Sequence, residues 1–260
     1  MTRLYGTNRY YTSLLAADQL KAELGVEKFD AIIVATGKDY ADALSGSYLA
    51  AQKNAPIILI SGSASTLSRA QEYIEANLKS GGTVYVLGGE GAVDATSYAG
   101  LEEAAVKVSG SAKRLAGDNR YRTSVAILKE AGVAAGSEIL VTIGTDFKGA
   151  LSVSSTGLPL LTVNNKSLTG NKDDGKEDGQ KEFLESLEGV TFTIIGGTDV
   201  ISEEFAALLA EYGTVERIDG DDQYLKIAEK YFGKSDAAVL VRSDDFADGL
   251  SSGIIAKSIE

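Results

Sequence analysis

The stretch Arg3–Ser13 (RLYGTNRYYTS) decides the fold, because it returns twice further along the chain. It recurs closely as Arg114–Ser124 (RLAGDNRYRTS) and more loosely as Arg217–Tyr224 (RIDGDDQY). A segment that returns in this way indicates that one folding unit was copied in tandem. The sequence therefore predicts a unit over residues 1–110, a second over 111–213 and a partial third over 214–260.

Three further segments recur in the same order. The motif DYADALS at 39–45 returns as DFKGALS at 146–152 and as DFADGLS at 245–251. The chain's two prolines open the matching segments PIIL at 56–59 and PLLT at 159–162, and YVLGG at 85–89 matches TIIGG at 193–197. The third copy reaches Glu260 without the proline segment or the Gly-Gly turn. We therefore expect about half of a third unit and a natural protein that continues.

Composition excludes several kinds of chemistry. The chain has 260 residues, a net charge of −12, and neither Cys nor His. It therefore has no disulfide, no thiol nucleophile, no histidine-dependent triad and no Cys/His zinc site. The acidic balance argues against nucleic acid as a partner. No apolar run is long enough to span a membrane. Met1–Gly6 does not resemble a signal peptide, so we expect either a cytoplasmic protein or a piece of an exported one.

Strand and helix patterns alternate within each unit. Short apolar runs predict buried strands, and longer stretches with helical spacing predict helices. In the first unit the expected strands are Phe29–Ala35, Ile57–Ile60 and Val84–Leu87, and the expected helices follow Thr7, begin at Asp39 and cover 66–79 and 94–104. Thr7, or Asp118 in the second unit, is a plausible helix N-cap. Alternation of this kind predicts an α/β fold with parallel sheets. No long linker separates the units, so they should pack against one another.

Together these motifs resemble the cell wall binding repeat type 2 family of Gram-positive surface proteins. The resemblance covers essentially the whole chain, with Gly149 where the family pattern has Asp and Gln223 where it has Arg. It implies Toprim-like (flavodoxin-like) α/β units packed as a three-lobed anchor. It also implies noncovalent attachment to anionic wall polymers, such as teichoic-acid-like chains or secondary wall polysaccharide, at the cell wall or in the S-layer. The proline segments are thought to matter for anchoring in the family, which points to Pro56, Ile57, Ile58, Leu59, Pro159, Leu160 and Leu161.

Five of the eight arginines lie in the repeated motif, namely Arg3, Arg9, Arg114, Arg120 and Arg217. Guanidinium groups bind phosphate or carboxylate groups of a polymer through paired hydrogen bonds. They also pair with carboxylates inside packed interfaces, and we favour this structural interpretation. Only the second unit lacks the motif aspartate, and only the third lacks the second arginine. This pattern suggests that Arg120 pairs with Asp42 and, if the units close into a ring, that Arg9 pairs with Asp248.

Two other functions remain open from the sequence. Asp39 with Asp42, or Asp245 with Asp248, would suit a Mg²⁺-dependent phosphoryl-transfer or nucleotide-binding enzyme, although capping and ion pairing at a helix start is the favoured role. Alternatively, the repeats form a scaffold that self-associates or binds S-layer proteins. We expect no enzyme activity and no resident cofactor or metal. The acidic charge would be offset by local Arg and Lys groups or by bridging cations such as Ca²⁺.

Overall fold

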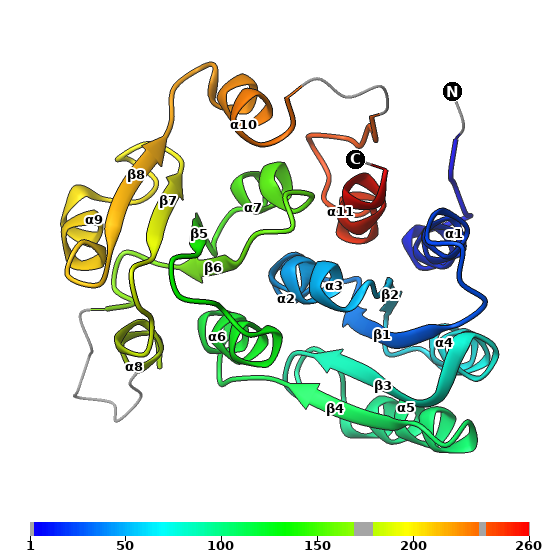
Figure 1. The fold of residues 1–260 in the computed structure, drawn as a ribbon. Coiled ribbons are helices and arrows are strands. Elements are labelled where there is room, and N and C mark those ends of the chain that lie inside the picture. Colours follow the sequence, from blue (N-terminus) through cyan, green and yellow to red (C-terminus); the bar gives the residue numbers. More distant parts are fainter. Residues whose placement is uncertain (1–2, 169–178, 234–237, 260) are drawn as a thin grey trace.

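The fold consists of two parallel four-stranded sheets with helices packed around them (Figure 1). The computed structural model describes residues 3–168, 179–233 and 238–259. The first sheet contains β1 (Phe29–Thr36), β2 (Ile57–Ile60), β3 (Leu78–Leu87) and β4 (Ser111–Leu115). The second contains β5 (Glu138–Ile143), β6 (Leu160–Val163), β7 (Thr191–Ile195) and β8 (Thr214–Ile218). Both sheets have the same strand order, β2-β1-β3-β4 and β6-β5-β7-β8, so the predicted repeat of an α/β unit with a parallel sheet is confirmed.

The fourth strand of each sheet is contributed by the next repeat. β4 carries Arg114, in the second copy of the opening motif, yet it pairs with β3 of the first sheet. β8 carries Arg217, in the third copy, and pairs with β7. The divisions expected at 110/111 and 213/214 therefore mark where the sequence repeats, whereas each sheet extends about five residues further along the chain. Each repeat is consequently bound to the one before it by a ladder of backbone hydrogen bonds.

Helices cover both faces and one edge of each sheet. In the first unit α4 (Ala64–Asn77) and α5 (Ala95–Lys107) pack on one face, and α2 (Ala41–Ser45) and α3 (Ser47–Lys53) on the other. In the second unit α9 (Glu203–Leu209) and α7 (Lys148–Val153) contact the sheet, while α8 (Gln180–Glu185) packs against α6. The first helix of each repeat, α1 (Arg9–Glu23) or α6 (Arg120–Ala131), contacts the edge strand β2 or β6.

The repeated serine of the opening motif explains how that edge is sealed. Ser13 Oγ accepts a hydrogen bond from the Leu59 amide at 3.0 Å, and Ser124 Oγ accepts one from the Thr162 amide at 3.0 Å. Pro56 and Pro159 directly precede the two edge strands, and their carbonyls accept from the amides of Ile33 and Leu140 in the neighbouring strands. The repeated serine therefore satisfies one outward-facing amide of each edge strand, which would otherwise be open to unwanted strand pairing.

The described part of the third repeat completes a ring. It contains α10 (Gln223–Tyr231) and α11 (Gly249–Ser258), and residues 238–242 form no strand there. α6 packs on α3, α10 packs on α7, and α1 packs on α11. Each repeat thus places its first helix against the second helical segment of the preceding repeat, and the first repeat does so against the third. Figure 1 shows α2, α7 and α11 gathered around the middle of the molecule.

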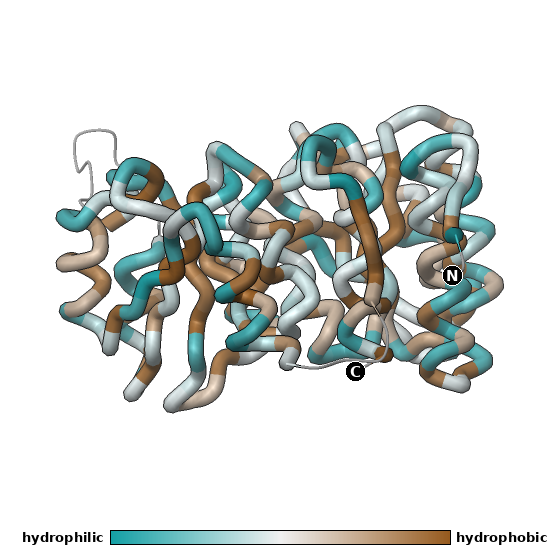
Figure 2. The backbone as a smooth tube through the Cα atoms, turned by 90° about the horizontal axis from the view of Figure 1, so that it is seen from above, coloured by the Kyte–Doolittle hydropathy of each residue, from teal (hydrophilic) through white to brown (hydrophobic). Residues whose placement is uncertain are grey.

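The larger of two apolar clusters runs through all three repeats, and the other lies mainly in the second unit. The larger cluster of buried residues combines most of the first unit with Ile127 and Leu160 of the second and Ile254 of the third. Figure 2 shows hydrophobic segments running through the interior and hydrophilic ones at the outer turns. Between the first two units, Tyr48 Oη donates to the Gly132 carbonyl at 2.8 Å, and the hydroxyls of Ser45 and Thr162 lie 3.0 Å apart. The expectation that the units pack against one another is confirmed.

Several local predictions need correction. The helix N-caps are Asn8 and Asn119, each of which accepts two backbone N–H groups, so Thr7 and Asp118 were wrong. The strand expected at Val84–Leu87 begins at Leu78, six residues earlier. The short strands that carry Arg114 and Arg217 were not predicted, because only about half of their residues are apolar. The polar, glycine-containing segment 166–181, for which the sequence predicts a surface loop, lies mostly outside the described residues, at 169–178.

Candidate functional site

The second repeated motif brings three aromatic rings together at the centre of the ring of helices. Tyr40, Phe147 and Phe246 occupy the same position in the three copies of that motif. Their ring centroids are 5.8, 5.6 and 5.7 Å apart, and the planes are tilted by 59–65°. These tilted geometries are the ones that aromatic pairs prefer. The three side chains therefore form a nearly threefold junction, which we call the aromatic hub.

Motif arginines from the following repeat surround the hub. The Arg120 guanidinium lies 5.4 Å from the Tyr40 ring, and the Arg9 guanidinium lies 5.2 Å from the Phe246 ring. The third copy has Gln223 at the equivalent position. Each arginine therefore rests on the aromatic side chain of the preceding repeat, a favourable cation–π arrangement. Sequence reasoning overlooked the hub, although the repeated aromatic after the motif aspartate was the signal for it.

Arg120 has partners in two repeats. Its Nη1 donates to the Gly144 carbonyl at 2.5 Å and to Tyr40 Oη at 3.3 Å, and its Nη2 forms an ion pair with Asp39 at 3.1 Å. The predicted pairing with Asp42 is therefore wrong in its partner. The ion-pair partner of Arg120 is Asp39, which lies three residues before Asp42 and next to Tyr40.

The expected pair of Arg9 with Asp248 is not formed. Arg9 Nη1 donates to the Gly37 carbonyl at 2.9 Å, which matches the bond from Arg120 to Gly144 in the second unit. The remainder of the Arg9 guanidinium faces Phe246, and Asp248 is exposed at the start of α11. The first and third repeats do contact each other, as the prediction assumed. Arg9 makes this contact through the aromatic side chain of Phe246 and not through the carboxylate of Asp248.

Arg114 and Arg217 hold the glycine turns. Arg114 Nη1 donates to the Gly88 carbonyl at 2.7 Å, and Arg217 Nη1 donates to the Gly196 carbonyl at 2.8 Å. The Arg114 guanidinium also lies 4.5 Å from the Tyr98 ring, and Arg217 pairs with Glu203 at 3.3 Å. In contrast, Arg3 is exposed and lies over the Tyr5 ring at 5.2 Å. Four of the five motif arginines thus hold a backbone carbonyl, whereas the structural interpretation expected carboxylate partners; Arg120 and Arg217 have such a partner in addition.

The proline segments are inside the protein. The side chains of these segments are buried, with exposed fractions of 3% or less for the five residues Ile57, Ile58, Leu59, Leu160 and Leu161. Pro56 and Pro159 are buried as well. These residues cannot touch a polymer on the surface, so assigning them to direct ligand contact needs correction. They form, or directly precede, the edge strands on which α1 and α6 pack. A substitution in these segments would affect anchoring by destabilising the fold and not by removing a contact with the polymer.

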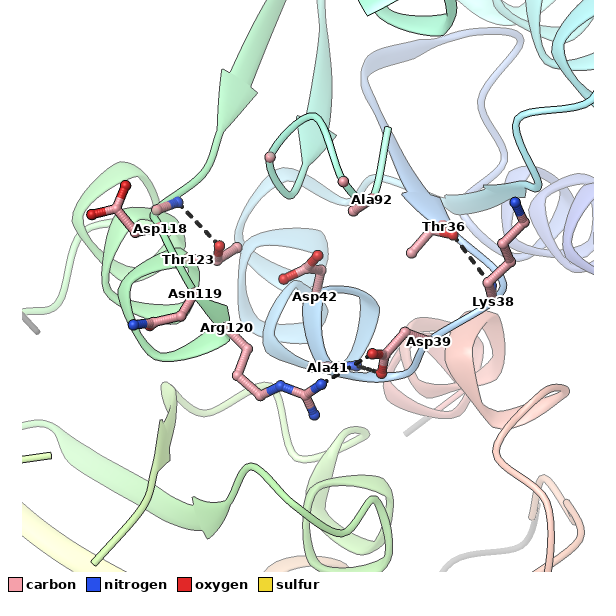
Figure 3. Close-up of a pocket in the computed structure, with 13 residues that line it drawn as sticks. Thr36, Lys38, Asp39, Ala41, Asp42, Ala92, Asp118, Asn119, Arg120 and Thr123 are labelled. Atoms are coloured by element: carbon pink, nitrogen blue, oxygen red, sulfur yellow. Dashed lines mark hydrogen bonds and ion pairs between the residues drawn. The ribbon is translucent and has the colours of Figure 1, made fainter. Parts of the chain in front are cut away.

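A cavity of about 320 Å³ opens at the carboxyl ends of β1, β3 and β4 (Figure 3). Its walls come from three segments: the loop after β1 with the start of α2, the glycine turn after β3, and the motif of the second repeat. The lining residues are Thr36, Lys38, Asp39, Ala41, Asp42, Gly89, Gly91, Ala92, Gly117, Asp118, Asn119, Arg120 and Thr123. In an open parallel sheet the connections diverge to opposite sides between β1 and β3, and ligands of such folds bind in that crevice. The cavity lies at this place in the first sheet.

Asp42 is the charged group at the middle of the cavity. Figure 3 shows its carboxylate pointing into the space between Thr123 and Ala92. Burial raises its pKa to about 6, with a further contribution from the negative charge of Asp39 and an opposing one from Arg120. A Cβ added at Gly88 would come within 2.4 Å of Asp42 Oδ2, and Gly88 has a φ of +94°. Only glycine fits this turn beside the carboxylate.

Two hydroxyls of the cavity already have partners. Thr36 Oγ1 accepts from the Lys38 amide at 3.2 Å, and Thr123 Oγ1 accepts from the Gly117 amide at 3.1 Å. The latter bond has a copy in the first repeat, from Gly6 to Thr12 at 3.1 Å. Among the described residues, no three acidic side chains come together as metal ligands would. The cavity therefore presents a carboxylate and backbone groups instead of a metal cage.

The comparisons with known proteins agree with this architecture. The family model for cell wall binding domain 2 matches residues 3–98 and 114–206, which are the two complete repeats. The chain belongs to the cell wall binding domain 2 family. Membership confirms the resemblance noted in the motifs, and the aromatic hub and arginine contacts are features of these wall-binding repeats in this chain.

Two curated proteins from Bacillus subtilis (strain 168) are related to the wall-binding repeats. N-acetylmuramoyl-L-alanine amidase LytC is 28% identical over 85% of this chain and 40% of its own length. The amidase enhancer is 25% identical over 98% of this chain and 33% of its own length. The chain thus spans well under half of each relative.

Two solved structures share the fold. Cwp8 from Clostridium difficile is 26% identical with a TM-score of 0.76, and the match covers 98% of this chain and 43% of that one. Cwp6 from Clostridium difficile is 21% identical with a TM-score of 0.80, over 98% of this chain and 40% of that one. The high TM-scores over nearly the whole chain confirm the predicted fold class, including the arrangement of repeats.

Proposed function

We propose that this chain anchors a surface protein noncovalently to an anionic polymer of the cell wall. The observation that carries this proposal is the match of both complete repeats to cell wall binding domain 2. The relation to Cwp8 over 98% of the chain supports a place at the cell surface. Nowhere in the described residues is a helix long and apolar enough to cross a membrane.

The proposed role of the chain is binding and not catalysis. The relative named as an amidase matches this chain over 40% of its own length, which is consistent with a shared attachment region. The chain has neither Cys nor His. We expect the purified chain to release no products from cell walls, and a colorimetric assay for new amino groups would check this. Release of amino groups by the chain alone would contradict a pure binding role.

The contacts to the polymer are proposed to be weak and spread over the repeats. Arg9, Arg114, Arg120 and Arg217 already hold backbone carbonyls, so they contribute little free binding capacity. With a net charge of −12, attraction to an anionic chain has to be local. Weak contacts on units held at fixed spacing add through effective concentration. All units would then be needed for retention.

The test is co-sedimentation of the full chain with purified Gram-positive cell walls. Walls stripped of their anionic polymers by mild acid are the matched control. The proposal predicts retention on intact walls and loss of most retention on stripped walls. Equal retention on both preparations, or none on intact walls, would contradict it.

A further inference from the structure

The cavity beside Asp42 has an electrostatic character opposite to that of an anion site. The carboxylate of Asp42 is central, and Arg120 directs its guanidinium to Asp39, Tyr40 and Gly144. Figure 3 shows the Lys38 amine pointing away from Asp42. A phosphate placed in this cavity would lie close to Asp42, and like charges at short distance in a partly buried site repel strongly. The cavity therefore favours a neutral or positively charged group.

The Asp42 carboxylate accepts no hydrogen bond from another described residue, and its side chain is half-buried in the wall of the cavity. Partial removal of a carboxylate from water without a partner raises the free energy of the folded state. The neighbouring aspartate is different, because Asp39 accepts from the amides of Tyr40 and Ala41 and pairs with Arg120. The Asp42 carboxylate can therefore accept a hydrogen bond from a ligand without losing one to the protein.

The cavity has room for one small ligand. A cavity of about 320 Å³ lies at the lower end of the range for small-molecule sites. Gly91 has nothing within 4 Å of an added Cβ, and Gly89 has only the Gly117 carbonyl, at 3.8 Å. The glycines therefore leave backbone groups open to a ligand on the side of the cavity that faces Asp42.

We propose that this cavity binds a single sugar residue, whose hydroxyl or ammonium group donates a hydrogen bond to Asp42. This inference rests on the proposed function, since the sugar would belong to the wall polymer. In this proposal, the cavity in the first unit recognises the sugar of the wall polymer. The second unit has Gly149 at the equivalent position, and Asp248 in the third is exposed, so the three repeats are not equivalent in binding.

The experiment is a titration of the isotope-labelled full chain with glucosamine, glucose and inorganic phosphate, followed by backbone amide resonances. Expected are saturable shifts at Thr36, Gly89 and Gly117 with at least one sugar, and none with phosphate there. Titration to about 100 mM is sufficient for the millimolar affinity of a single sugar contact. Tighter binding of glucosamine than of glucose identifies the ammonium group as the donor, and equal binding identifies the hydroxyls.

Asp42→Asn is the decisive variant, and Asp30→Asn, at the exposed amino end of β1 and outside the cavity, is its matched control. We expect Asp42→Asn to weaken sugar binding at least tenfold and Asp30→Asn to change it less than twofold. No shifts with either sugar, shifts unchanged in Asp42→Asn, or shifts with phosphate alone would overturn the proposal. Wall co-sedimentation of the unaltered chain separates the two ideas, because its retention would stand even if the sugar site fails.

Discussion

At the scale of single residues, repeated positions carry repeated bonds. Arg9 and Arg120 hold the glycine carbonyl after the first strand of their own units, and Arg114 and Arg217 hold the glycine turns. The sequence predicted that these arginines are structural, because they recur in an acidic chain. It could not predict that Asp39 is the partner of Arg120, because the two aspartates of the motif are only three residues apart and either could reach the guanidinium.

We expect Asp42→Asn to stabilise the protein near neutral pH. The folded state raises the pKa of Asp42 from 3.8 to about 6, so it binds more protons than the unfolded state in that interval. Stability from this group is therefore full below about pH 4 and is lost as pH rises to about 6. Asn mimics the protonated form, so the gain should reach roughly 1–2 kcal/mol above pH 7, after allowance for partial solvent exposure.

Thermal unfolding from pH 4 to pH 8 would measure this difference. Asp118→Asn is the control, since Asp118 is in an exposed pair with Arg122. A gain that is the same at all pH values, or a loss above pH 7, would show that the Asp42 carboxylate is not destabilised by burial.

Arg120→Ala is expected to lower the free energy of unfolding by about 2 kcal/mol. The substitution removes charge-assisted bonds to Gly144 and Asp39 and a contact with the Tyr40 ring. Arg9 occupies the equivalent position and forms no ion pair with another described residue, so Arg9→Ala should cost about 1 kcal/mol. Urea unfolding of both variants checks the order. A larger loss for Arg9→Ala would contradict the assigned partners.

At the scale of elements, the alternation of apolar runs predicted β1 and β2 closely. Both are buried on two faces and have almost continuous apolar sequences. The strands β4 and β8 have exposed positions in alternation, and their sequences SAKRL and TVERI show few apolar residues. They are strands because a partner from the preceding repeat pairs with them. Such tertiary context is not readable in a window of five residues.

The docking of α11 can be tested at a glycine. A Cβ added at Gly253 would lie 2.8 Å from the carbonyl oxygen of Ser154, which is backbone and cannot move aside easily. Gly253→Val should therefore lower the free energy of unfolding by about 1–3 kcal/mol. Gly91→Val meets nothing within 4 Å and serves as the control. Equal effects of the two substitutions in thermal unfolding would show that α11 does not pack as described.

At the scale of the whole molecule, the ring is closed by the aromatic hub. Phe147 and Phe246 belong to different repeats, and their ring centroids are 5.7 Å apart. A double-mutant cycle with Phe147→Leu and Phe246→Leu should give a coupling energy of about 1 kcal/mol. The control is the pair Phe147 and Phe29, which belong to the same apolar cluster but have no ring contact with each other among the described residues. No coupling between Phe147 and Phe246 would mean that the repeats fold side by side without the hub.

The most direct test of anchoring is isothermal titration of the full chain with anionic polymer released from purified walls. The proposed function predicts saturable binding to the soluble polymer, weakened by added salt because ionic contacts are screened. It also predicts no binding to the peptidoglycan that remains after the polymer is removed. Binding to the stripped peptidoglycan with no heat from the polymer would contradict the account.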